Sequence, residues 1–93
     1  MRTIERTSLF KRDYKRESKG QHRATLANDF APILTALAND QLLVEKYRDH
    51  ALTGEWSDHR DCHVKPDLIL NYRKPDTDSL QLVRLGSHSE LGF

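Results

Sequence analysis

Histidine is the residue of this sequence with the clearest potential for chemistry. Four of its five histidines lie in the second half of the chain, at His50, His59, His63 and His88. His63 and Asp67 flank a tight turn at Lys65-Pro66-Asp67, so we expect their side chains to converge at one end of a sheet. Because histidine titrates near neutral pH, this group predicts proton transfer at a rim built from loops. Ordinary surface or core histidines are the alternative.

Two kinds of chemistry fit these residues. In RNA cleavage the substrate supplies its own nucleophile, the 2′-hydroxyl, and the protein needs a base, an acid and cations. The residue types for that reaction are present at His50, His63, Asp67, His88, Arg60 and Arg84. A zinc site from His59, Cys62 and His63 is disfavoured, because adjacent strand residues such as Cys62 and His63 point to opposite faces. We therefore expect no metal and no cofactor.

Positive charge is concentrated at the N-terminus. Residues 1–23 carry eight basic and three acidic side chains, whereas the whole chain has a net charge of +1. A helix with Phe10 and Tyr14 on its inner face leaves its basic residues outside, namely Lys11, Arg12, Lys15, Arg16 and Lys19. Such a segment is typical of contact with a polyanion or an acidic partner, and a solvated helix face is the alternative.

Trp56 lies just before the strand that carries His63. Its ring could stack on a nucleobase, which would make Trp56 an RNA-binding residue. The alternative is a hydrophobic anchor for its own loop. The sequence leaves both interpretations open.

Two helices are expected in the first half of the chain. Thr3–Arg6 is predicted to be a short strand, and the hydroxyl of Thr7 or Ser8 can cap a first helix that ends near Gly20. Apolar residues at helical spacing predict a second helix from about residue 23 to 40, continuous through its internal proline with a local distortion.

The second half of the chain has the pattern of short strands and turns. Strands are predicted at Arg60–Val64, Leu68–Arg73 and Leu80–Leu85. Two helices followed by an antiparallel meander predict an α+β domain, a small sheet with both helices on one face. The other face stays partly open for function.

Composition limits the class of protein. The chain has 93 residues, of which 37% are hydrophobic and 31% charged, so we expect one domain over residues 1–93. The lone Cys62 excludes an internal disulfide, and no apolar run reaches the roughly 18 residues of a membrane helix. The N-terminus lacks an apolar signal sequence. These features predict a soluble, cytoplasmic protein with no membrane contact.

The segment from Tyr47 to Asp67 resembles the YafQ branch of the RelE-like toxins. The resemblance rests on His50, Gly54, Trp56, Arg60-Asp61, His63 and Pro66-Asp67, and it continues at Leu70-Asn-Tyr72, Gly86 and His88. It implies a type II toxin of a toxin–antitoxin pair, folded as a small twisted antiparallel sheet with two N-terminal helices. Such toxins are ribosome-dependent endoribonucleases that cut mRNA in the decoding site without a metal.

The resemblance also implies roles for individual residues. His88 would be the general acid, His50 or Asp67 the base, and His63 would orient the scissile phosphate. Arg60 and Arg84 would neutralise phosphates. The implied partners are mRNA, the ribosome with its ribosomal RNA, and a small, dimeric, DNA-binding antitoxin whose acidic or amphipathic segment covers the basic first helix or the catalytic rim.

Three positions depart from the family pattern. The terminal aromatic ring implied in RNA binding is Phe93, one residue later than in the relatives, with Gly92 at the usual position. Leu68 stands where many relatives carry Trp, and His59 replaces an aromatic residue. The alternative functions are a ParE-like protein that poisons DNA gyrase and a non-catalytic binding module of the same fold.

Overall fold

The computed structural model describes residues 1–92. Five strands and three α-helices alternate with two short 3₁₀ turns, in the order β1 (Thr3–Arg6), α1 (Ser8–Glu17), α2 (Leu26–Ala38), η1 (Glu45–Tyr47), β2 (His50–Ala51), η2 (Gly54–Trp56), β3 (Arg60–Lys65), β4 (Leu68–Arg73), β5 (Ser79–Gly86) and α3 (His88–Leu91). The predicted α+β class is confirmed.

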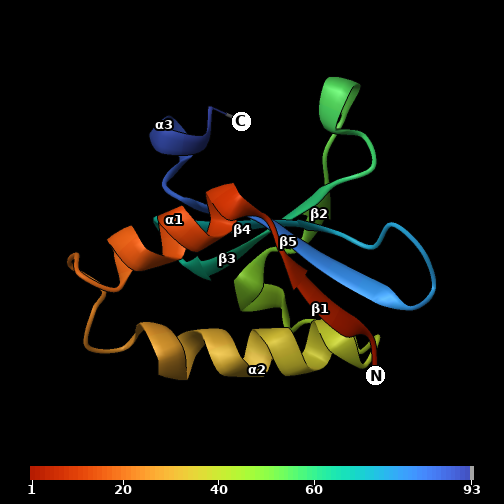
Figure 1. Cartoon of the computed structure of the whole chain (residues 1–93), viewed down its shortest axis with the longest axis horizontal. Helices are drawn as coiled ribbons and strands as arrows, with labels where there is room; N and C mark the ends of the chain where they lie inside the picture. Colours follow the sequence, from red (N-terminus) through yellow and green to blue (C-terminus); the bar gives the residue numbers. More distant parts are fainter. Residues whose placement is uncertain (93) are drawn as a thin grey trace.

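The strands form one sheet in the order β1-β5-β4-β3-β2. The meander expected from β3 to β5 is antiparallel, but β1 pairs with β5 in parallel, so the sheet is mixed. The parallel pairing arises because the chain passes through α1 and α2 before it reaches the rest of the sheet (Figure 1). The sequence pattern predicts the strand β1 but contains no signal for its neighbour.

Both N-terminal helices are present but shorter than predicted. Helix α1 begins as expected, with the Thr7 hydroxyl accepting a hydrogen bond from the Phe10 N–H. It ends at Glu17 instead of Gly20, and α2 begins only at Leu26, because the residues between them form turns. Helix α2 is continuous through Pro32, as predicted.

The hydrophobic core lies between the helices and one face of the sheet. Helix α2 runs along that face, on the side of the sheet opposite to α3 (Figure 1). Phe30, Ile33 and Leu37 of α2 join one buried cluster with Leu70 and other apolar residues of the strands. Among residues 1–92 no helix is long and apolar enough to span a membrane.

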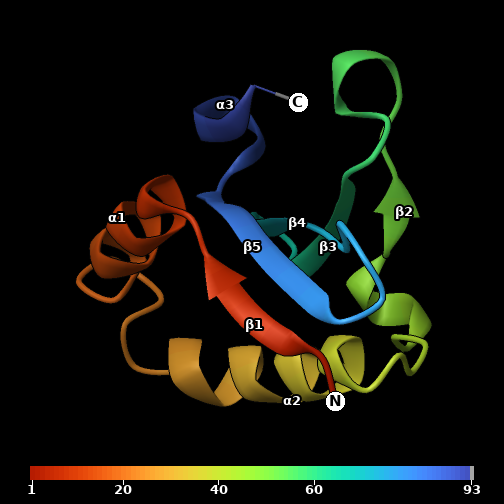
Figure 2. The same ribbon diagram turned by 45° about the vertical axis from the view of Figure 1, so that its right-hand side comes forward.

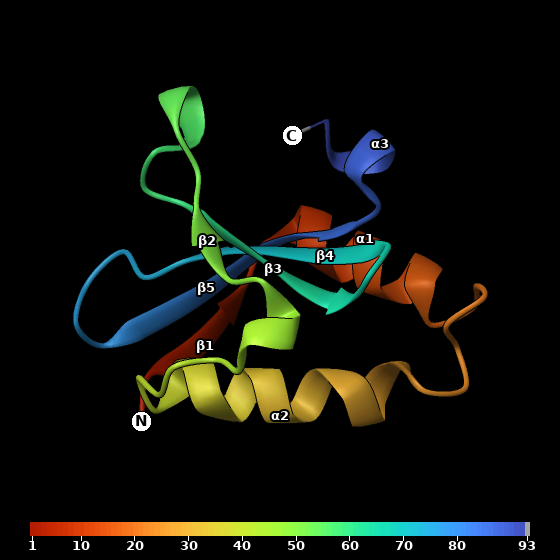
Figure 3. The ribbon, with the colours of Figure 1, turned by 180° about the vertical axis from the view of Figure 1, so that it is seen from behind.

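The opposite face of the sheet carries two projecting segments. Helix α3 and the loop that contains η2 both rise on the side away from α2, which the view from behind also shows (Figure 3). Helix α3 was not predicted, although its signal is present in the sequence. Ser87 and Glu90 form a capping box, in which each side chain bonds the backbone N–H of the other residue.

Candidate active site

Three histidines from three elements meet on the face of the sheet away from α2. The ring centroids of His50 and His63 are 6.4 Å apart, and those of His63 and His88 are 5.5 Å apart. The three rings line an open pocket of about 630 Å³ together with Glu45, Arg48 and Asp49. Figure 2 shows α3 and the loop that follows β2 projecting on the same side of the sheet.

Local structure sets the tautomers of two of these histidines. Nδ1 of His50 lies 2.7 Å from the carbonyl oxygen of Arg48, a residue in the left-handed conformation. Nδ1 of His63 lies 3.3 Å from the carbonyl oxygen of Pro66 in the tight turn. Because a carbonyl oxygen only accepts, each Nδ1 carries the hydrogen, and the neutral ring keeps a lone pair on Nε2. Both rings are thus able to accept a proton at Nε2.

His88 is positioned by helix α3. It is the first residue of that helix and is exposed. Nε of Arg16 lies 3.3 Å from the carboxylate of Glu90 in the same helix, and an Arg16 N–H donates to the Leu85 carbonyl oxygen at 3.0 Å. Arg16, predicted to bind RNA, therefore holds α3 against α1 and β5.

A buried carboxylate beneath the histidines was not assigned a role from the sequence. Asp61 is 1% exposed, pairs with His50 across β2 and β3, and lies two residues from His63 on the same strand. Burial raises the pKa of Asp61, although a hydrogen bond from Asn71 and the charges of His50, His88 and His63 act in the opposite direction. The predicted alternation on this strand does place Asp61 and His63 on one face, and that was the available signal.

Asn71 completes the buried polar layer. Its side-chain N–H donates to the Asp61 carboxylate at 3.0 Å, while its own carbonyl oxygen has no partner among the described residues. Leaving a buried acceptor unpaired costs stability. The layer beneath the histidines is therefore polar and incompletely bonded.

The Asp67 carboxylate contacts residues other than the three histidines of the pocket. It accepts a hydrogen bond from Gln21 at 3.1 Å and lies 3.3 Å from Nε2 of His22. Both partners belong to the connection between α1 and α2. Asp67 is not among the residues that line the histidine pocket within the described chain.

The arginines predicted to neutralise phosphates are held by carboxylates. Arg60 donates to Asp49 from Nε and Nη2, at 3.3 and 3.2 Å, and lines a groove on the other side of Asp49. Arg84 donates from Nε to the buried Asp13 at 2.7 Å. The cation that lines the histidine pocket is instead Arg48. Arg48 was not among the predicted site residues, because nothing in its spacing in the sequence distinguishes it from other surface arginines.

The other predicted RNA-binding residues lie outside the histidine pocket or outside the described residues. The basic residues predicted to bind RNA in and just after α1, other than Arg16, are exposed, namely Lys11, Arg12, Lys15 and Lys19. Trp56 packs edge-on against His59, with ring centroids 4.9 Å apart. Leu68 is buried in the core. Phe93 lies outside the residues that the structure describes.

The chain is similar to known bacterial toxins over almost its whole length. The family model described as a bacterial toxin of type II toxin–antitoxin systems, YafQ, matches residues 2–92. The mRNA interferase toxin YafQ of Escherichia coli K12 is 37% identical over 91 residues, which cover 97% of this chain and 95% of the relative.

Solved structures agree over almost the whole chain. One chain of the E. coli DinJ–YafQ complex superposes with a TM-score of 0.82 at 35% identity, and the match covers 98% of this chain and 98% of that one. A copper-bound mutant toxin from Helicobacter pylori gives a TM-score of 0.85 at 33% identity, covering 98% of this chain and 99% of that one.

Proposed function

Since the chain belongs to the YafQ family of toxins from type II toxin–antitoxin systems, we propose that it cuts mRNA at the pocket lined by His50, His63 and His88. The family makes it an mRNA interferase, an endoribonuclease. The observation that carries the choice of site is the meeting of three imidazoles from β2, β3 and α3 around one open pocket. The gyrase-poisoning alternative is not favoured by these relatives.

The proposed reaction is attack of the 2′-hydroxyl on the adjacent phosphorus. His50 takes the hydroxyl proton at Nε2 while the 2′-oxygen bonds to phosphorus. The bond from phosphorus to the 5′-oxygen breaks, and His88 gives that oxygen a proton. The products are a 2′,3′-cyclic phosphate and a free 5′-hydroxyl. Each proton transfer is worth about 10²–10⁴-fold in rate.

His50 fits the role of base better than Asp67. The Nδ1–H of His50 is directed at the Arg48 carbonyl oxygen, which leaves Nε2 with the lone pair. The Asp67 carboxylate is occupied by Gln21 and His22. The pair of variants His50→Gln and Asp67→Asn decides between them, since only the variant of the true base loses cleavage at every pH.

His63 and Arg48 are proposed to hold the phosphate. His63 lies between the other two rings, and Arg48 is the cation that lines the pocket within the described residues. A single arginine on an open pocket offers weak binding to free RNA, because affinity for nucleic acid grows with the number of phosphate contacts. The ribosome would then supply most of the positioning of the mRNA, in the cytoplasm.

The test is the mapping of mRNA ends by primer extension in a purified translation reaction. Wild type, His88→Ala and the control His59→Gln are compared with and without ribosomes, at constant Mg²⁺. The toxin is treated with EDTA beforehand, which tests the proposed metal-free reaction. We expect cleavage only with ribosomes, unchanged by chelation and lost in His88→Ala. No cleavage by folded wild type would overturn the proposal.

An antitoxin partner is proposed as well. The solved complex of the relative is that of DinJ with YafQ, and 98% of this chain superposes on one chain of that complex. We expect the product of the gene adjacent to that of this chain to co-purify with it in a salt-stable complex. Separation of the two proteins in moderate salt would contradict this expectation.

A further inference from the structure

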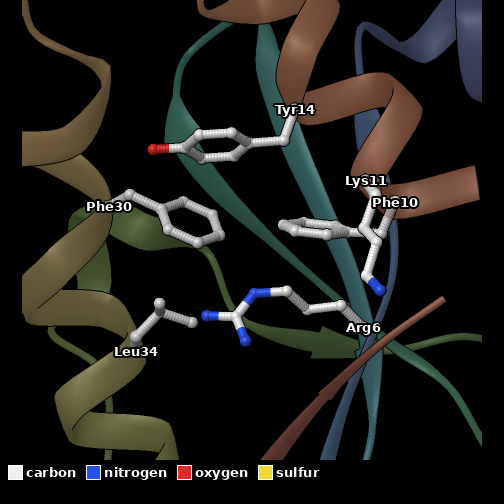
Figure 4. Close-up of a pocket in the computed structure, with 6 residues that line it drawn as sticks. All are labelled: Arg6, Phe10, Lys11, Tyr14, Phe30 and Leu34. Carbon is white, nitrogen blue, oxygen red and sulfur yellow. The ribbon is translucent and has the colours of Figure 1, made fainter. Parts of the chain in front are cut away.

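Asp49 lies between two cavities of the molecule. It lines the histidine pocket, and it also lines a groove of about 300 Å³ together with Arg60 and Tyr72. The pocket between α1 and α2 is different, because none of the six residues drawn in Figure 4 lines the histidine pocket. Asp49 comes directly before His50 in the chain. The contacts that hold Asp49 therefore also restrict the position of the His50 imidazole.

The Asp49 carboxylate is held by two strands of the sheet. The Tyr72 hydroxyl of β4 donates a hydrogen bond to Oδ1. The Arg60 guanidinium of β3 donates from Nε to Oδ1 at 3.3 Å and from Nη2 to Oδ2 at 3.2 Å. Two parallel bonds from a guanidinium fix a carboxylate in orientation as well as in distance. We call Asp49, Arg60 and Tyr72 the Asp49 clamp.

The backbone next to Asp49 needs such support. Arg48, the residue before it, has φ of 50° and ψ of 43°, which lie in the left-handed region. A residue other than glycine keeps this conformation only where the surrounding structure enforces it. Strand β2 begins at His50, has two residues and pairs with β3 alone, so it supplies few backbone hydrogen bonds. The clamp thus bonds the segment to the sheet beside its strained residue.

The conformation of Arg48 decides which nitrogen of His50 carries the hydrogen. The Arg48 carbonyl oxygen lies 2.7 Å from Nδ1 of His50 and accepts its hydrogen. If Asp49 is released, relaxation of Arg48 to the right-handed region turns this carbonyl away from the ring. A neutral imidazole without that acceptor exchanges between its two tautomers. The tautomer with hydrogen on Nε2 has no lone pair there to accept a proton.

We infer that Arg60 and Tyr72 are positioning residues, which act through Asp49 to keep His50 in the tautomer that accepts a proton at Nε2. The inference rests on the proposed function, in which His50 is the base. It gives Arg60 a role different from the phosphate contact that the family resemblance implies. The Arg60 guanidinium is directed at Asp49, and Arg60 is not among the described residues that line the histidine pocket.

Nitrogen-15 NMR of the imidazoles measures the tautomers in the free protein. Tyr72→Phe removes one hydroxyl from the clamp, and Arg60→Gln removes the guanidinium. The matched control is Tyr14→Phe, since Tyr14 belongs to α1 and lines the separate pocket of Figure 4. Spectra are recorded at about pH 8.5, because imidazole is neutral well above the usual histidine pKa of about 6.5.

We expect His50 to carry its hydrogen on Nδ1 in wild type and in Tyr14→Phe. In both clamp variants the Nδ1 signal of His50 should move toward that of a nitrogen without hydrogen. The Nδ1 signal of His63, which faces a carbonyl oxygen of the tight turn, should not change. An unchanged His50 signal in both clamp variants would overturn the inference. If melting shows that Tyr72→Phe is unfolded, Arg60→Gln decides alone, since its side chain is 44% exposed.

Cleavage kinetics on programmed ribosomes separate positioning from phosphate binding. Each clamp variant should lower kcat by about tenfold to a hundredfold and leave KM within about twofold of wild type, since misplacement of a reacting group by about 1 Å costs up to about a hundredfold. The double variant Arg60→Gln with Tyr72→Phe should lose little more than the worse single variant, because both residues act through Asp49.

Two other outcomes are distinguishable. A raised KM in Arg60→Gln with unchanged kcat, together with multiplied effects in the double variant, would overturn the inference and return Arg60 to phosphate binding. Failure of the proposed function differs from both, because wild type itself would then not cut mRNA, while the shift of the His50 tautomer in the clamp variants would still be observed.

Discussion

Asp13 and Asp61 are both buried carboxylates, but their surroundings differ. Asp13 accepts hydrogen bonds from Arg84, from Arg16 and from the Leu85 N–H, and it joins α1 to β5. Asp61 accepts one hydrogen bond from Asn71 and lies beneath histidines that are themselves able to take up protons. The first carboxylate is surrounded by permanent positive charge, and the second by charge that depends on pH.

The two pKa directions reflect this difference. Burial alone would raise the pKa of Asp13, but the hydrogen bonds from Arg84 and Leu85 and the charges of both arginines hold it below its usual range. Burial raises the pKa of Asp61, and its weaker partners do not offset that effect. The comparison shows that permanently charged partners offset the effect of burial on the pKa of Asp13, whereas the hydrogen bond from Asn71 and the neighbouring histidines do not offset it at Asp61.

The largest expected effect is on the rate of mRNA cleavage, at the histidines next to Asp61. Replacing His88 by Ala should lower the rate of mRNA cleavage about 10²–10⁴-fold, because the leaving 5′-oxygen then lacks its acid. The melting temperature should change little, since His88 is exposed. Single-turnover cleavage on programmed ribosomes measures the rate, with His59→Gln as the matched control. An unchanged rate in His88→Ala would remove the histidines from catalysis.

The next effect should be on stability at Asp13. Asp13→Ala leaves Arg84 and the Leu85 N–H without their carboxylate, and loss of one partner of a buried pair costs about 3–5 kcal/mol of the free energy of unfolding. Urea denaturation at pH 7 measures the loss. The control Glu5→Ala, at an exposed residue of β1, should stay within about 0.5 kcal/mol of wild type. Equal midpoints for the two variants would contradict the structural role of Asp13.

A smaller effect is expected from the charge of Asp61 on the reaction. Asp61→Asn keeps the shape and the bond partner but removes the negative charge beneath the imidazoles. Asp61 and the protonated imidazoles attract each other, since the charges of His50, His88 and His63 act to lower the pKa of Asp61. The acidic side of the pH–rate profile should therefore shift to lower pH in the variant, a change that a purely structural role would not produce. An identical profile would show that Asp61 does not influence the histidines.

The smallest effect is the pH dependence of stability, which should have opposite signs at the two carboxylates. The folded pKa of Asp13 is depressed, so its stabilisation is present above the unfolded value of about 4 and is lost as pH falls through the folded pKa. The folded pKa of Asp61 is raised, so its ionisation costs stability as pH rises above about 4.

Melting experiments at pH 3 and pH 8 on the variants Asp13→Asn and Asp61→Asn test these opposite pH dependences of stability. Asp13→Asn should be less stable than wild type at pH 8, with a difference that narrows at pH 3. Asp61→Asn should be more stable than wild type at pH 8, because burial raises the pKa of Asp61 and its ionisation costs stability, and the two should be equally stable at pH 3. Parallel pH curves for the two variants would contradict the contrast between the carboxylates.

The sequence by itself determined the local elements of this protein and the residue types of its candidate site. The bounds of Leu68–Arg73 match β4, and the Thr7 cap and the turn at Pro66 are present as predicted. These features depend on residues only a few positions apart, whose periodicity and capping chemistry are visible in the chain. The histidines were recognised as candidates by type, spacing and family resemblance.

Only the tertiary structure determined which of the candidate site residues lie close together. It placed the Asp67 carboxylate against Gln21 and His22, and it paired Arg84 with Asp13, a residue 71 positions away. It also buried Asp61 beneath the histidines. Contacts between distant segments depend on how helices and strands pack, and no local pattern contains that information. Burial and charge partners follow from packing, so the chemistry available to each side chain does as well.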